Sequence, residues 1–287
     1  MTRMITPLRA EVRLAAQPAA VLTVLIAGAA AVRAVFWYLD AATRGMAEAD
    51  QGLAALATPA GAVQAAAWHH ASLLGLVLAA LLGGVVLAEG LESGTWPLVR
   101  LYQARVWLLM VRKLVVVLFL GVLSMAVTAA VLWTAIRICQ VVEPPGGPRH
   151  LSAPSDPAPP DVHLPGWGDA SAACAKALLV LSFFATLTLC AAAAARAVIP
   201  AAVLGAGPLA ATLPLVTTGW RTWTPHYWIA AWMELPDSTQ WNAYWWSSTP
   251  GAPDTDTALA VLCTSSGALL VVTLLLLRAE RSLSARI

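Results

Sequence analysis

The chain has 287 residues, of which 59% are hydrophobic and only 11% are charged. Soluble domains carry about 25% charged residues, so this composition excludes an ordinary soluble protein and predicts an integral membrane protein. The formal net charge of +2 is small, so the positions of the charges are more informative than their sum.

The N-terminal segment predicts a surface helix followed by a first membrane span. Residues 4–17 carry an apolar stripe at helical spacing, with Arg9 and Arg13 outside it, which is typical of a helix lying at the membrane surface. Pro18 is expected to break that helix. The apolar run that follows, about 19–39, is long enough to cross a hydrocarbon core of about 30 Å.

Five further apolar runs bring the predicted number of membrane spans to six. They cover about 63–88, 114–136, 172–195, 198–217 and 258–277. Pro208 and Pro214 are expected to kink the fifth span. The second span has a small residue at every fourth position, which lets another helix approach closely and which we interpret as packing. These residues are Ala71, Gly75, Ala79 and Gly83. The sequence thus predicts an all-α membrane protein with one transmembrane domain over residues 1–287.

A polar segment, 89–113, lies between the second and third spans. Gly94 suits the left-handed residue that closes the incoming helix, and Thr95 suits the N-cap of a new helix. Leu98 and Leu101 then fall on one face, which predicts a short amphipathic helix across the inner mouth of the protein.

The distribution of charge predicts that both termini are cytoplasmic. With both termini inside, the inner segments hold four of the 15 acidic residues and eleven of the 17 basic ones. The basic residues are Arg3, Arg9, Arg13, Arg100, Arg105, Arg112, Lys113, Arg196, Arg278, Arg281 and Arg286. Basic residues concentrate in cytoplasmic loops. The proline-rich segment 143–165 and the long connection 218–257 are therefore expected outside.

Within the segment 89–113, the motif Glu92-Ser93-Gly94-Thr95 is followed by Arg105 and then by Lys113 at the start of the next span. This order resembles the acidic-x-Gly-Thr…Ser-Arg…Gly-Lys signature of the ABC-2 type permeases, whose six-helix plan the whole chain also fits. The usual proline before the Ser-Arg pair is missing and Pro97 stands earlier, so the helix is expected to be short or tilted.

The resemblance implies a membrane subunit of an ATP-driven exporter, in which a coupling helix docks on a separate ATPase. It assigns coupling to Glu89, Glu92, Gly94, Thr95, Leu98, Leu101, Arg105 and Lys113. No GxxxxGK[ST] loop occurs, so the partner would bind ATP and Mg, and this chain would not itself be an enzyme. The alternative interpretation is an ordinary charged loop in which Gly94 and Thr95 serve only as caps.

The implied partners are a P-loop ATPase subunit, a second copy or a related permease subunit, and membrane lipids, with no nucleic acid. The implied location is the plasma (inner) membrane. Because the spans are apolar and lack a charged path, the expected cargo is hydrophobic or amphipathic, such as a drug, an antibiotic, a peptide or a lipid.

The outer connection 218–257 holds seven of the chain's 13 tryptophans. Thr224-Pro225 predicts the start of a short helix that places Trp228 and Trp232 on one face. Trp241 and Trp245 repeat this spacing in what is expected to be a second short helix. An aromatic belt at the outer headgroups and a lid over a substrate exit both fit these residues.

His69 and His70 lie within the second span, where ionisable side chains suggest function. They motivate an alternative function, a membrane-embedded redox or lipid-modifying enzyme. Adjacent residues on a helix point about 100° apart, so the pair cannot bind one metal as an i, i+4 pair could. No catalytic, cofactor-binding or metal-binding residue is therefore assigned. The four cysteines show no metal-binding spacing and are expected to be buried free thiols: Cys139, Cys174, Cys190 and Cys263.

Overall fold

The computed structural model describes residues 2–43, 51–94, 106–142, 164–212, 214–215, 220–234 and 254–284. All regular secondary structure in these ranges is helical, which confirms the predicted all-α class. The described chain divides into two compact units. The first comprises Met1–Ala20, His70–Val122 and Ala177–Ile287, and the second comprises Val21–His69 and Leu123–Lys176.

Four helices of the described chain are long and apolar enough to cross a membrane, so this is a multi-pass membrane protein. They are α1 (Thr2–Thr43, apolar from Ala15), α7 (Val106–Val142), α8 (Trp167–Ala195) and α11 (Thr255–Ser284, apolar to Arg278). A fifth results if α3 (Pro59–His70) and the helical segment Gly75–Ala88 are taken as one broken span.

The predicted separation of an interfacial helix 4–17 from the first span is wrong. Helix α1 continues through Pro18 from Thr2 to Thr43. A proline inside a helix removes one N–H donor, and neighbouring groups can compensate for this loss in an apolar setting. The sequence rule for proline therefore overestimated the effect of this single residue.

The predicted second span, 63–88, is interrupted in the structure. Helix α3 ends at His70, and α4 (Leu73–Gly83) begins after a break at 71–72. A Cβ on Gly75 would overlap the carbonyl group of His70, so only glycine allows this close approach after the break. Helix α4 continues into the π-helical turn η1 (Gly84–Ala88) and then into α5 (Glu89–Glu92).

The predicted fifth span is shorter than expected. Helix α9 runs from Val198 to Thr212, 15 residues with Pro208 inside it. At 1.5 Å per residue this is about 22 Å, which is less than the hydrocarbon core of about 30 Å.

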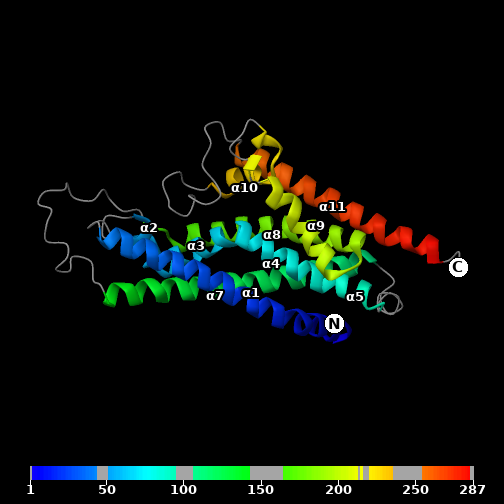
Figure 1. Cartoon of the computed structure of the whole chain (residues 1–287), viewed down its shortest axis with the longest axis horizontal. Helices are drawn as coiled ribbons and strands as arrows, with labels where there is room; N and C mark the ends of the chain where they lie inside the picture. Colours follow the sequence, from blue (N-terminus) through cyan, green and yellow to red (C-terminus); the bar gives the residue numbers. More distant parts are fainter. Residues whose placement is uncertain are drawn as a thin grey trace, which may run out of the picture. The chain divides into compact units, whose positions relative to one another are not determined.

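In the first unit, α9 packs against α4 and η1, and α10 (Pro225–Met233) packs against the start of α11 (Figure 1). Two glycines of this unit, Gly83 of α4 and Gly205 of α9, lie close to Thr188 of α8. A Cβ on Gly83 would meet the side chain of Thr188 at 3.0 Å, and one on Gly205 would meet its Oγ1 at 2.8 Å. The small residue at position 83 therefore serves packing, as the sequence predicted.

In the second unit, α2 (Gln51–Leu56) and α3 are joined by a short turn. Thr58 starts α3 by accepting a hydrogen bond from the N–H of Gly61 at 3.0 Å. The indole N–H of Trp133, on α7, donates to the carbonyl of Ala57 in this turn at 3.2 Å. This bond connects α7 to the α2–α3 turn.

Candidate functional site

The helix that leads into the predicted coupling segment ends as the sequence predicted. Helix α5 stops at Glu92, and Gly94 follows with a φ of +68°, in the left-handed region. The N–H of Gly94 donates to the carbonyl of Leu91 at 3.4 Å. A Cβ on Gly94 would have no atom within 4 Å, so backbone conformation alone favours glycine here.

The centre of the predicted coupling segment lies outside the described residues. This applies to Thr95, Leu98, Leu101 and Arg105. Glu89 lies in α5, but its side chain is not among those described. Of the eight predicted coupling residues, the structure thus describes the side chains of Glu92 and Lys113 and the turn at Gly94.

The two ends of this segment meet in one apolar cluster. Val106, which follows residues 95–105, is buried there, and Leu91, which precedes them, packs against the same cluster. Helices η1, α7, α8, α9 and α11 all contribute buried residues. These are Leu87, Ala88, Val106, Leu109, Met110, Leu189, Ala192, Ala193, Ala201 and Leu277. The residues that flank 95–105 therefore belong to a core shared by five helical elements.

Glu92 contacts the N-terminus of another helix. Its Oε2 accepts a hydrogen bond of 2.9 Å from the backbone N–H of Val198, the first residue of α9. The first N–H groups of a helix have no partner within the helix, and a carboxylate there also benefits from the helix dipole. The sequence offered no signal for this contact, because 106 residues separate the two partners.

The turn between α8 and α9 is short. Helix α8 ends at Ala195, as predicted, and α9 begins at Val198. Arg196 adopts a φ of 57°, which is uncommon for a residue with a side chain, and its N–H donates to the carbonyl of Ala192 at 2.9 Å. This left-handed residue closes α8 and reverses the chain within two residues.

Lys113 is buried, with 7% of its surface exposed. Its Nζ donates to the carbonyl of Val86 at 2.5 Å, inside the π-helical turn η1. The structure thus joins both described ends of the resembling motif to neighbouring helical elements, Glu92 to α9 and Lys113 to η1.

The predicted helix start at Thr224-Pro225 is confirmed. Thr224 caps α10 and Pro225 occupies the first turn. The indole of Trp228 is half-buried and donates to the carbonyl of Thr222 at 3.0 Å, and Trp232 is also half-buried. Trp241 and Trp245 lie outside the described residues.

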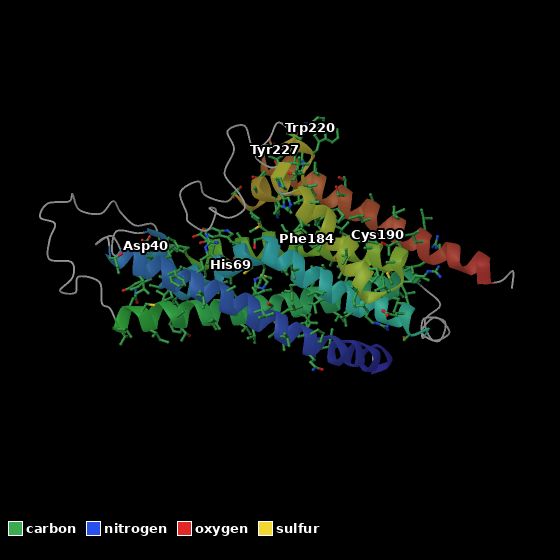
Figure 2. The ribbon with its side chains drawn as sticks, in the orientation of Figure 1. Asp40, His69, Phe184, Cys190, Trp220 and Tyr227 are labelled. Carbon is green, nitrogen blue, oxygen red and sulfur yellow. The ribbon has the colours of Figure 1, made fainter. Side chains whose placement is uncertain are left out.

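The buried face of α10 is not its tryptophan face. His226, Tyr227, Ile229 and Met233 are buried, whereas Trp220, just before α10, projects away from the ribbon (Figure 2). The Nε2 of His226 lies 2.7 Å from the carbonyl oxygen of Leu209 in α9. A carbonyl can only accept, so Nε2 carries the proton. The sequence placed His226 in an outer loop and did not reveal this contact.

A second side-chain contact fixes the other end of α10. Glu234 follows the helix with a φ of 48°, and its Oε1 accepts a hydrogen bond of 2.8 Å from the hydroxyl of Thr255. Thr255 is the first residue of α11. Helix α10 is therefore connected to α9 by His226 and to α11 by Glu234.

His69 and His70 are both buried at the C-terminal end of α3. Within the described ranges, no group of three His, Cys, Asp or Glu side chains is arranged to hold a metal ion. All four cysteines are free, but none is fully buried and Cys263 is exposed, so the expectation of buried thiols is wrong.

Comparisons with protein-family models, with curated proteins and with solved structures found no match to this chain.

Proposed function

We propose that this chain is the membrane subunit of an ABC-2 type exporter, paired with itself or a related subunit and driven by a separate P-loop ATPase. The observation that supports the proposal is that the described residues of the motif contact the surrounding helical elements. Glu92 contacts α9, Lys113 contacts η1, and the residues flanking the segment 95–105 share one core. A docking helix needs such connections to move the membrane domain.

In this proposal, ATP and Mg are bound by the partner ATPase. Closure of the ATPase pair displaces the coupling helix at 95–103, and the core around Leu109 and Leu189 repacks. Close-packed interiors rearrange between discrete packings rather than deforming continuously, so this displacement switches the chain from an inward-facing to an outward-facing form. The proposed six-span arrangement includes α9 and the broken pair α3 and α4. The cargo is hydrophobic or amphipathic.

The first test is co-purification of a P-loop ATPase with the chain, together with its ATP hydrolysis in lipid. Leu101→Asp would place a charge on the face proposed to meet the ATPase, and an unpaired buried charge is poorly tolerated. It is expected to abolish co-purification and stimulated hydrolysis while the chain still inserts. Gln103→Ala, on the polar face of the same segment, is the matched control and should be mild. Failure of any P-loop ATPase to associate with the chain would rule the proposal out.

The proposed topology has both termini and the segment 89–113 in the cytoplasm. Cysteine introduced at Ser155 or Ser247 should react with an impermeant reagent in intact cells, whereas cysteine at Ser284 should be protected. Each variant is compared with a background in which the four native cysteines are replaced. The opposite labelling pattern would invert the topology.

The buried pair His69 and His70 favours one second candidate, a membrane-embedded redox or lipid-modifying enzyme. An absorption spectrum and metal analysis of the purified protein test the redox form, and colourless, metal-free protein would remove it. The lipid-modifying form requires that a defined activity on lipid is lost in His69→Ala or His70→Ala.

A further inference from the structure

The contact between Glu92 and Val198 lies beside apolar packing. Leu91, the neighbour of Glu92, and Val198 itself both pack against the same buried cluster. A Cβ on Gly84 of η1 would lie 3.3 Å from the carbonyl oxygen of Val198, so the two backbones are already close. The carboxylate therefore connects two segments that apolar packing also holds together.

The start of α9 has little freedom to absorb a movement. Only Arg196 and Ala197 separate it from α8, and Arg196 already adopts a left-handed conformation. A displacement of α5 that pulls on Val198 would thus move α9 rather than be lost in a loop. Because α9 also receives the hydrogen bond from His226, the other end of α9 is connected to α10.

We propose that Glu92 is a positioning residue that transmits movement of the coupling segment to α9, instead of contacting the ATPase. This inference rests on the proposed function and assigns Glu92 a different role from Leu101. The carboxylate accepts the N–H of Val198, so that α5 and the N-terminal end of α9 move together.

Substitutions at both partners separate this role from general stability. Glu92→Ala removes the acceptor, and Glu92→Gln retains a carbonyl oxygen that can accept the same N–H. Val198→Pro removes the donor at the first helical position, where proline is well tolerated. Ala194→Ser, an exposed position near the end of α8, is the control.

The measurement is hydrogen exchange of the α9 amides in the chain assembled with its ATPase in lipid, with ADP and with ATP plus vanadate. In the wild type, ATP is expected to change exchange across 199–207. In Glu92→Ala and in Val198→Pro, this change should shrink by about threefold, which is in the range expected for the loss of one hydrogen bond. Glu92→Gln should retain most of the nucleotide-dependent change. The double variant Glu92→Ala with Val198→Pro should reduce this change no further than either single variant does.

The amount of bound ATPase and the basal hydrolysis rate should stay unchanged in every variant. A full nucleotide response of α9 in Glu92→Ala would overturn the inference, and so would additive effects in the double variant. Loss of ATPase binding in Glu92→Ala alone would also overturn it, because Glu92 would then belong to the docking surface. If the wild-type chain binds no ATPase, the proposed function fails and this inference fails with it. If the ATPase binds but α9 does not respond, only the inference fails.

Discussion

The ammonium group of Lys113 donates a hydrogen bond to the carbonyl of Val86, 27 residues earlier and inside the π-helical turn η1. A π-helical turn is rare and is frequently found at functional sites. A buried ammonium group in turn needs acceptors. The hydrogen bond therefore supplies an acceptor for the buried ammonium group and connects α7 to η1, next to the proposed coupling segment.

Replacing Lys113 with methionine should destabilise the protein. The protein would lose the hydrogen bond between the charged ammonium group and the carbonyl of Val86, and hydrogen bonds to charged groups contribute about 1.5–3 kcal/mol. The thermal midpoint of the purified protein should fall by roughly 2–4 °C per kcal/mol. Val115→Met, an exposed position on the same helix, should leave the midpoint almost unchanged. Equal midpoints for the two variants would show that the contact does not contribute to stability.

Gly94 should tolerate asparagine but not valine. Its φ of +68° is strained for most residues with a Cβ, by about 1–2 kcal/mol, and a β-branched residue resists it most. Asparagine adopts this conformation readily, and the position has open space for a side chain. Gly94→Val should therefore lower the thermal midpoint and, under the proposed function, the ATPase-coupled activity, and Gly94→Asn should largely preserve both. Two equally impaired variants would point to crowding instead of backbone strain.

The local features of the fold were predictable from sequence because their causes are local. The left-handed turn at Gly94, the cap at Thr224 and the end of α8 at Ala195 each follow from the residues at that point of the chain. The apolar runs likewise predicted α7, α8 and α11, since span length and hydrophobicity are set within each segment.

The remaining features depend on partners that are distant in sequence. Glu92 looked like part of a docking surface, and only the fold shows that the N–H of Val198 is its partner. His226 looked like an exposed loop residue, because the carbonyl of Leu209 is brought to it by α9. The break between α3 and α4 was equally hidden, because Gly75 was counted only as one member of a small-residue stripe.

Gly205 should be sensitive to the smallest possible enlargement. Its Cβ would lie 2.8 Å from Oγ1 of Thr188, so Gly205→Ala would overpack the contact between α8 and α9 at a cost of about 1–3 kcal/mol. On the same helix a Cβ on Gly207 would have no atom within 4 Å, so Gly207→Ala should be neutral or stabilising by up to about 1 kcal/mol.

The thermal midpoint of Gly205→Ala should therefore fall, and that of Gly207→Ala should stay the same or rise. Adding Thr188→Ala to Gly205→Ala removes the Oγ1 that the new Cβ would meet, and it should recover part of the lost stability. No recovery would mean that the backbone of α8, 3.3 Å away at Cα, is the limiting contact.

Acid should weaken the contact between α10 and α9 through His226. Burial lowers the pKa of His226 below its ordinary value of 6.5, and the hydrogen bond to the carbonyl of Leu209 offsets only part of this effect. In the unfolded chain, His226 titrates near 6.5. Between that value and the lower pKa of the folded state, the unfolded chain binds more protons. The contribution of His226 to stability is thus complete above about pH 6.5 and decreases as the pH falls through this window.

His226→Gln isolates this effect from the titration of other groups. Glutamine stays neutral and has an amide N–H that can donate to the carbonyl of Leu209. Wild-type protein should lose more of its thermal stability between pH 7.5 and pH 5.5 than His226→Gln does. At pH 7.5 the thermal midpoints of the two proteins should be similar. His226→Ala, which has no donor for that carbonyl, should be less stable than both at pH 7.5. Parallel pH dependences for wild type and His226→Gln would show that His226 does not control the attachment of α10 to α9.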